Sequence, residues 1–157
     1  MSLLNPYSVS VALAVFFAAL AYFRPHTARL VIGIFFLVMA LGVNLGVTLT
    51  DPGLFAAAGS RALLPFYRWF FSEVLARWPL PFALALIVFE TIVGGLILSK
   101  GRAVRLGLSA AVLFCLLLTP VGVEELTAPL LTVSFFLLLR HNFPQPAFHR
   151  SAAARAG

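Results

Sequence analysis

Charged residues and cysteines are both scarce in this chain. Only 10% of its 157 residues are Asp, Glu, Lys or Arg, whereas 62% are hydrophobic, and its mean hydropathy is +1.04. Charged residues make up about a quarter of an average soluble domain, so this composition excludes an ordinary soluble globular protein. The single cysteine, Cys115, excludes an intrachain disulfide and a Cys-x-x-Cys redox motif. We interpret Cys115 as a small buried packing residue, since it lies inside an apolar run.

Groups of side chains that bind metal or catalyse a reaction are missing from the sequence as well. All three histidines lie outside the apolar runs, so we expect no haem or other metal site. No nucleophile is paired with a base, so we expect no catalysis by this chain alone. An isomerase that uses Glu90 with an outer acid, Glu124 or Asp51, stays open.

Apolar runs long enough to cross a bilayer follow one another along the chain, separated by Pro, Gly and charged residues. A transmembrane helix needs about 20 mainly apolar residues. We therefore predict an all-α, polytopic membrane protein with a single domain, residues 1–146, and a flexible basic tail, residues 147–157. The five predicted transmembrane helices are residues 7–23, 30–49, 80–98, 104–119 and 126–140. The fifth run is short, and a start at Glu124 or a continuation past Arg140 toward Phe143 stays open.

The first run, residues 7–23, also has the length of a signal peptide. A signal peptide begins with a basic segment, but residues 1–10 contain no Lys or Arg, and Arg24 follows the run instead. We therefore predict that the first run is an uncleaved transmembrane helix.

Residues 61–77 differ from the apolar runs because they mix charged and aromatic side chains. Pro65 suits a first helical turn, and Glu73 and Arg77 have the spacing of a helical ion pair. We predict an amphipathic helix at the membrane surface, with its aromatic side chains at the interface. Two roles stay open for it: a surface anchor, or a lid over the mouth of a pocket, in which Arg68 or Arg61 contacts an anionic group.

The basic residues are distributed unevenly between the two ends of the predicted helices. With five spans, one side holds eight of the eleven Lys and Arg residues and no acidic residue. Basic residues in short loops favour the cytoplasm, so we predict a cytoplasmic C-terminus and an outside N-terminus. Because these residues flank apolar runs, we interpret them as topology signals and expect no nucleic-acid partner. The eight are Arg24, Arg29, Lys100, Arg102, Arg105, Arg140, Arg150 and Arg155.

One acidic residue, Glu90, lies near the middle of the third apolar run. A carboxylate at that depth costs about 2.5–3.5 kcal/mol on insertion scales, so it should face protein, a polar cavity or a ligand rather than lipid. Thr91 follows it, and Gly94 lies one helical turn further on the same face, where a small residue leaves room for a helix or a ligand. We predict that Glu90, Thr91 and Gly94 belong to a ligand-binding site.

Asn44 is a second polar residue inside an apolar run. It lies between Gly42 and Gly46, whose four-residue spacing predicts the close approach of a neighbouring helix. An amide at this depth needs a hydrogen-bond partner, either on another helix or on the ligand, and both interpretations stay open. Asn44 and Arg68 complete the predicted ligand-binding residues.

A resemblance to the DoxX-like family of small bacterial membrane proteins is carried by two segments. One is FETIVGGLILSKGRAVRLGLSAAVLF, with a mid-helix Glu, a Gly pair, a short basic turn and an Ala- and Leu-rich helix; the other is RLVIGIFFLVMALGVN. The likeness extends over residues 29–140. The family fold is a four-helix bundle, so residues 7–23 are an additional helix here. The resemblance implies a bacterial inner-membrane protein that acts as an accessory subunit of a quinone-linked oxidoreductase.

Three functions fit these observations. The first is the binding of a small hydrophobic ligand, such as quinone or lipid, through Glu90, whose carboxyl group can hydrogen-bond a quinone oxygen. The second is a proton-linked carrier or pore for a small solute, with Glu90 as the proton site. The third is a structural subunit of a larger membrane complex, in which Glu90 pairs with Asn44, with Ser109 or with a partner's basic group. The expected partners are therefore lipid, a hydrophobic ligand, a second membrane subunit or another copy of the chain.

Overall fold

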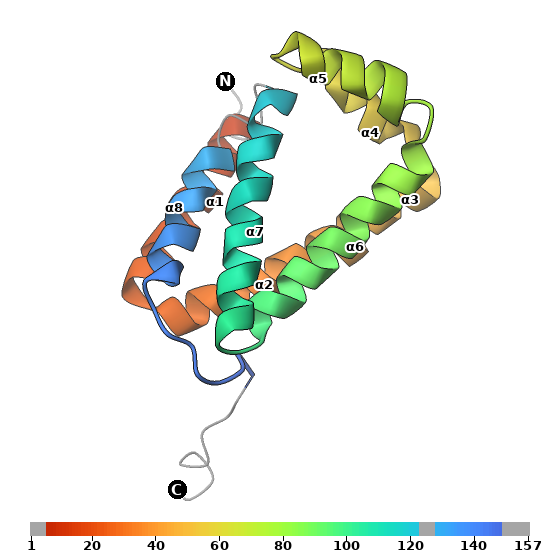
Figure 1. The fold of residues 1–157 in the computed structure, drawn as a ribbon. Helices are drawn as coiled ribbons and strands as arrows, with labels where there is room; N and C mark the ends of the chain where they lie inside the picture. The colour runs from red at the N-terminus through yellow and green to blue at the C-terminus, as the bar shows by residue number, and fades with distance from the viewer. Residues whose placement is uncertain (1–5, 123–127, 149–157) are drawn as a thin grey trace, which may run out of the picture.

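The computed structural model describes residues 6–122 and 128–148, and every regular element within these residues is a helix (Figure 1). The body of the protein consists of α1 (Pro6–Phe23), α2 (Pro25–Val38), α3 (Leu45–Thr50), α6 (Pro79–Leu98), α7 (Arg102–Leu118) and α8 (Ala128–Leu139). A π-helical stretch, η1 (Met39–Asn44), joins α2 to α3, so that these three elements form one continuous helix. A 3-10 turn, η4 (Thr119–Val121), follows α7.

Proline and glycine set where several helices begin. Pro25, Pro65 and Pro79 begin α2, α5 (Pro65–Trp69) and α6, where the missing N–H costs nothing and the fixed φ suits the helix. The predicted first-turn position of Pro65 is thus confirmed. The turn from α6 into α7 contains Gly101, whose φ of 61° lies in the left-handed region that a residue without Cβ adopts readily.

Three helices are long and apolar enough to cross a membrane: Pro25–Thr50, Pro79–Leu98 and Arg102–Val121. Two shorter apolar helices, Ser8–Phe23 and Ala128–Leu139, lie at either end of the described chain. The predicted start of the fifth span falls outside the described residues. Large hydrophobic side chains are exposed on all of these helices, as expected where the surrounding solvent is lipid. The chain is therefore a helical protein with the properties of a membrane protein.

The helices meet at one end of the molecule and separate toward the other (Figure 1). α1 packs along α8, α8 along α7, α7 against α6, and α6 against α2. From the shared end, α6 and the continuous α2–η1–α3 helix lean away together, whereas α1, α7 and α8 form a second group (Figure 1). The bundle thus has one closed end and one open end.

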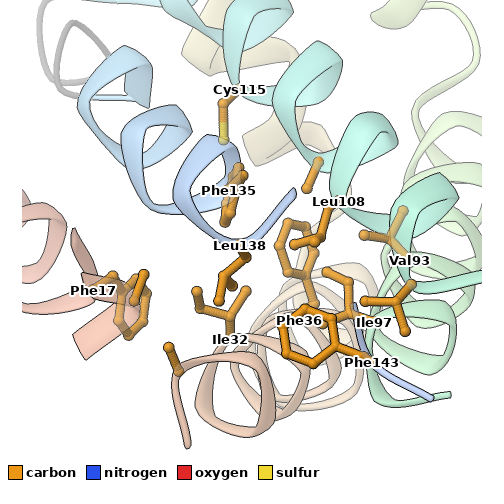
Figure 2. Packing of buried hydrophobic residues seen from close by; sticks show 14 of the residues in the cluster. Phe17, Ile32, Phe36, Val93, Ile97, Leu108, Cys115, Phe135, Leu138 and Phe143 are labelled. Carbon is orange, nitrogen blue, oxygen red and sulfur yellow. The ribbon is translucent and has the colours of Figure 1, made fainter. Parts of the chain in front are cut away.

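The hydrophobic core extends from the closed end along α7 and α8, and α1, α2, α6, α7 and α8 all contribute side chains to it (Figure 2). Ile32 and Phe36 of α2 meet Ile97 of α6 and Leu108 of α7, and Phe135 of α8 packs against the Phe36 ring with 6.3 Å between the ring centroids. Cys115 belongs to this core, 4% exposed, as its apolar surroundings in the sequence predict.

Glycines allow the closest helix contacts in the core. A Cβ at Gly107 of α7 would lie 2.9 Å from the Ile97 nitrogen and 2.9 Å from Leu96 Cβ, so only glycine fits against this part of α6. A Cβ at Gly94 of α6 would lie 3.0 Å from the Gly33 carbonyl oxygen of α2. α2, α6 and α7 are therefore held at backbone-contact distance, as small residues permit in membrane helices.

The predicted close approach at Gly42 and Gly46 is wrong. Nothing lies within 4 Å of a Cβ built at Gly46, and a Cβ at Gly42 would meet only Val38 of its own helix, at 3.8 Å. The buried positions of this helix recur every four residues, and Ala40 and Asn44 are two of them. Residues two positions away from this series lie on the opposite side of the helix, which explains why Gly42 and Gly46 do not contact α6.

The segment between α3 and α6 is interrupted rather than a single helix over residues 61–77. It consists of α4 (Gly53–Ala58), the 3-10 turn η2 (Gly59–Arg61), α5 and the π-helical η3 (Phe70–Leu75), and the chain is non-helical at residues 62–64. Arg77 forms the predicted ion pair with Glu73, at 3.0 Å.

Two hydrogen bonds fasten this outer segment to the far end of α7. The Leu63 N–H donates to the Pro120 carbonyl oxygen at 2.8 Å, and the Tyr67 hydroxyl donates to the Leu117 carbonyl oxygen at 3.0 Å. The outer segment therefore connects the two groups of helices at the open end.

Beyond α8, the chain runs back across the closed end instead of continuing as a helix toward Phe143. The Gly101 N–H donates to the Phe143 carbonyl oxygen at 2.8 Å, and the Ala147 N–H donates to the Leu98 carbonyl oxygen at 2.9 Å. The Phe143 ring is 3% exposed and joins the core. These bonds attach residues 142–148, defined here as the C-terminal strap, to the turn between α6 and α7.

Arg29 fixes the strap from the side of α2. From the sequence, Arg29 is predicted to lie in a loop at the cytoplasmic end of a span. It lies instead within α2 and is only 2% exposed. Its guanidinium group donates to the carbonyl oxygens of Gln145, at 3.1 Å, and Ser99, at 3.4 Å. Its Cζ lies 4.5 Å from the centroid of the Phe143 ring, a cation–π distance. The charge is thus held by carbonyl and aromatic groups.

We expect the substitution Gly107→Leu to destabilise the bundle by about 1–3 kcal/mol, because the added side chain overpacks the contact with α6. The matched control is Gly95→Leu, since nothing lies within 4 Å of a Cβ at Gly95. Unfolding in mixed micelles, followed by circular dichroism, measures both. Equal destabilisation by the two variants would contradict the close contact at Gly107.

Candidate functional site

The candidate site is a hydrogen-bonded pair formed by Glu90 of α6 and Asn44, the last residue of η1. The Asn44 Nδ2 donates to Glu90 Oε2 at 2.6 Å, across 46 residues of sequence. Both side chains are buried, with 4% of Glu90 and 8% of Asn44 exposed. The prediction that Glu90 faces the protein interior is confirmed, and of the two interpretations of Asn44 the structure shows the bond to another helix.

The π-helical stretch η1 helps to place Asn44 against α6. At its end, the Leu45 N–H bonds to the carbonyl oxygen of Ala40, five residues earlier, rather than to that of residue 41. An α-helix has about 3.6 residues per turn, so positions four residues apart drift steadily around it. The wider π turn takes up part of this drift and keeps Phe36, Ala40, Asn44 and Thr48 on the buried side.

The neighbouring hydroxyl groups are bonded within their own helices. Thr48 Oγ1 donates to the Asn44 carbonyl oxygen at 2.6 Å, and Thr91 Oγ1 donates to the Ile87 carbonyl oxygen at 2.7 Å. Such bonds satisfy a hydroxyl group inside an apolar helix. Thr91 therefore lies beside Glu90 in the chain, but its hydroxyl proton is already donated to its own helix.

Gly94 and Arg68, the other predicted ligand-binding residues, form no bond with the pair. Gly94 is buried where α6 meets Gly33 of α2, so its small size serves helix packing. Arg68 is exposed on α5 and its Nε donates to the Ala62 carbonyl oxygen at 2.7 Å, within the outer segment. The structure thus brings together Asn44 and Glu90, with Thr91 alongside.

The Glu90 carboxyl group keeps unused hydrogen-bonding capacity. Among the described residues, Asn44 is its one hydrogen-bond partner, and none of their basic side chains forms an ion pair with it. A carboxyl group has two oxygens and about four acceptor positions when ionised, or one donor and the remaining acceptors when protonated. A single amide donor leaves most of these positions for another group.

A second feature, not anticipated from the sequence, is a groove of about 270 Å³ between α6 and α7. It lies where the two groups of helices diverge, and only apolar side chains line it. They are Phe82, Ala85, Leu86 and Phe89 of α6, and Ala110, Leu113, Phe114 and Leu117 of α7. Phe89 precedes Glu90 in the chain, and the Tyr67 hydroxyl is bonded to the Leu117 carbonyl oxygen. The groove therefore begins one residue along α6 from Glu90, although neither Glu90 nor Asn44 lines it, and the outer segment borders it at Leu117.

Sequence reasoning misses the groove because its residues are ordinary apolar side chains at helical spacing. The groove exists because α6 and α7 diverge from their contact at Gly107. A single small residue in an apolar run does not predict the angle between two helices. Within the described residues, no group of three or more His, Cys, Asp or Glu side chains is arranged to hold a metal ion.

The fold and the site define a class: a helical protein with three helices long and apolar enough to span a membrane, a carboxyl–amide pair between two of them, and an apolar groove between α6 and α7. No protein-family model matches the chain, and no curated protein or solved structure matches it either.

We expect the substitution Asn44→Leu to lower stability by about 0.6–2 kcal/mol, the range of hydrogen bonds between membrane helices. The control is Thr91→Val, which removes a hydroxyl bonded to its own helix and should cost less. Unfolding midpoints in mixed micelles compare the two variants. A smaller effect of Asn44→Leu than of Thr91→Val would refute the bond between α6 and η1 as a stabilising contact.

Proposed function

We propose that this chain is a multi-pass membrane protein that binds a hydrophobic ligand, a quinone or a lipid. The polar head of the ligand hydrogen-bonds the Glu90 carboxyl group, and its apolar chain occupies the groove between α6 and α7. The observation that carries this proposal is the unused hydrogen-bonding capacity of Glu90, a carboxyl group in the middle of an apolar helix. A mainly apolar site with a few polar groups near it is typical of small-molecule binding.

The chemistry of the pair suits a quinone head. Asn44 holds one carboxyl oxygen, which orients the group, and the other oxygen is left to bond a carbonyl or hydroxyl of the ligand. A carboxylate can also accept a proton from the hydroxyl group of a bound hydroquinone at hydrogen-bond distance. The groove is wholly apolar, so it supplies contact area for an isoprenoid or acyl chain but no polar selectivity.

The membrane arrangement we propose has five spans, with α1 and α8 crossing the bilayer beside the three longer helices. The closed end, which carries the basic residues, faces the cytoplasm, because Lys and Arg in short loops are retained on that side. The outer segment then lies at the opposite surface. The Tyr67 hydroxyl of this segment is bonded to Leu117 at the rim of the groove, which supports the role of a lid over the groove rather than only that of a surface anchor.

The resemblance of the α6–α7 sequence to the DoxX-like family also supports a ligand-binding membrane protein. It suggests a bacterial inner-membrane protein that serves as an accessory subunit of a quinone-linked oxidoreductase. In that setting this chain would hold the quinone, and a partner subunit would carry out the electron transfer. The inference from family to function is an analogy of fold and sequence pattern.

A structural subunit is the second candidate, and the Asn44–Glu90 bond itself favours it. The bond satisfies part of the carboxyl group within the chain and joins two helices. In this role, Glu90 would stabilise α6 against η1 and would bind nothing else. The two candidate functions predict different results for a variant whose groove is filled by a large side chain: ligand binding is lost only if the groove holds the ligand.

We expect Ala85→Trp to reduce labelling by a photoreactive isoprenoid quinone by roughly tenfold, equivalent to about 1.4 kcal/mol, because the indole fills the groove. Glu90→Gln, which exchanges one carboxyl oxygen for an amide, should reduce labelling by roughly fivefold, about the loss of one hydrogen bond. The measurement is crosslinking of the full chain in nanodiscs, with labelled peptides identified by mass spectrometry.

The matched control is Leu84→Trp, which introduces the same indole group one residue away, at an exposed position outside the groove. It should label like the wild-type chain. If Ala85→Trp and Glu90→Gln also label like wild type while Glu90→Gln lowers stability, the ligand proposal fails and the structural role remains.

A further inference from the structure

A second pocket, of about 280 Å³, opens at the closed end of the bundle, away from the groove. It lies where the first turn of α7 meets the C-terminal strap, and it is lined by Gly101, Arg102, Arg105, Asn142, Phe143 and Pro144. None of these residues lines the groove or touches the Asn44–Glu90 pair. An inference about this pocket therefore does not rest on the proposed function.

Positive charge surrounds the pocket. Arg102 and Arg105 line it, and the guanidinium group of Arg29 lies behind its wall, 4.5 Å from the Phe143 ring. Lys100 precedes the turn. The sequence has no Asp or Glu in residues 1–50, none between Glu90 and Glu124, and none in residues 126–157. Nothing in these segments neutralises the cluster.

The geometry inside the pocket suits an anion. The Arg105 Nη2 donates to Asn142 Oδ1 at 2.6 Å, which fixes one guanidinium group against the strap. Arg102 is exposed and, within the described residues, its side chain forms no hydrogen bond or ion pair. α7 begins here without a side-chain cap, so its first backbone N–H groups and the positive end of its dipole add to the field.

We propose that this pocket binds the phosphate-bearing headgroup of an anionic phospholipid. The pocket lies at the end of helices that are long and apolar enough to span a bilayer, at the level where headgroups are found. Basic pockets between helices at the membrane surface bind such headgroups. Arg102 supplies the free guanidinium group, Arg105 the fixed one, and the acyl chains extend along the exposed apolar side chains of α7 such as Leu106.

Native mass spectrometry of the full chain in detergent tests this proposal by counting bound lipid. We expect phosphatidylglycerol to bind in preference to phosphatidylcholine. Arg102→Gln should weaken phosphatidylglycerol binding roughly fivefold, the loss of one arginine near a phosphate. The matched control, Arg24→Gln, removes the same charge from an exposed residue outside the pocket and should change binding less than twofold.

A second variant keeps the test decisive. Asn142→Asp places a carboxylate in the pocket against Arg105 and should weaken binding at least as much as Arg102→Gln. Equal losses from Arg24→Gln and Arg102→Gln would show diffuse charge attraction and overturn the proposal. It is also overturned if phosphatidylcholine binds equally, or if millimolar inorganic phosphate displaces the lipid completely, since the site is then for a free anion. Quinone labelling of the groove is read out separately, so either proposal can fail alone.

Discussion

A polar side chain buried in an apolar helix bundle must find its hydrogen-bond partner inside the protein, and this constraint shapes the molecule. Glu90 is held by Asn44 across two helices, and Arg29 is held by the Ser99 and Gln145 carbonyl oxygens. Each bond joins segments far apart in the chain, the first linking η1 to α6 and the second linking α2 to the strap. A buried polar group without any partner would cost several kcal/mol.

The divergence of the helices connects these bonds to function. Glycine contacts between α2, α6 and α7 close one end of the bundle, which the strap crosses. Toward the other end, α6 leaves α7, and an apolar groove opens between them on the part of α6 that leads to Glu90. At the closed end, the arginines in the first turn of α7 line a second pocket. The two candidate binding sites thus lie in different parts of the bundle.

The sequence predicts the features that depend only on the free-energy cost of burying a polar or ionisable side chain. An ionisable side chain within an apolar run has to face protein, so the interior positions of Glu90 and Asn44 follow from composition. Features that depend on which helix lies beside which do not follow. The spacing of Gly42 and Gly46 suggests a contact, but the π-helical turn and the four-residue burial pattern turn them away, and Gly33 makes the contact instead. Arg29 is similar, because its partners lie on a strap that no local pattern indicates.

The central claim is that the Glu90 carboxyl group is bonded to Asn44 inside the protein, and infrared spectroscopy of that group tests it directly. The Glu90 band is assigned by its disappearance in Glu90→Gln. Replacing Asn44 with Leu should shift the band, because the carboxyl oxygen loses its amide donor, whereas Thr91→Val should leave it in place. A Glu90 band that does not move when Asn44 is replaced would contradict the account.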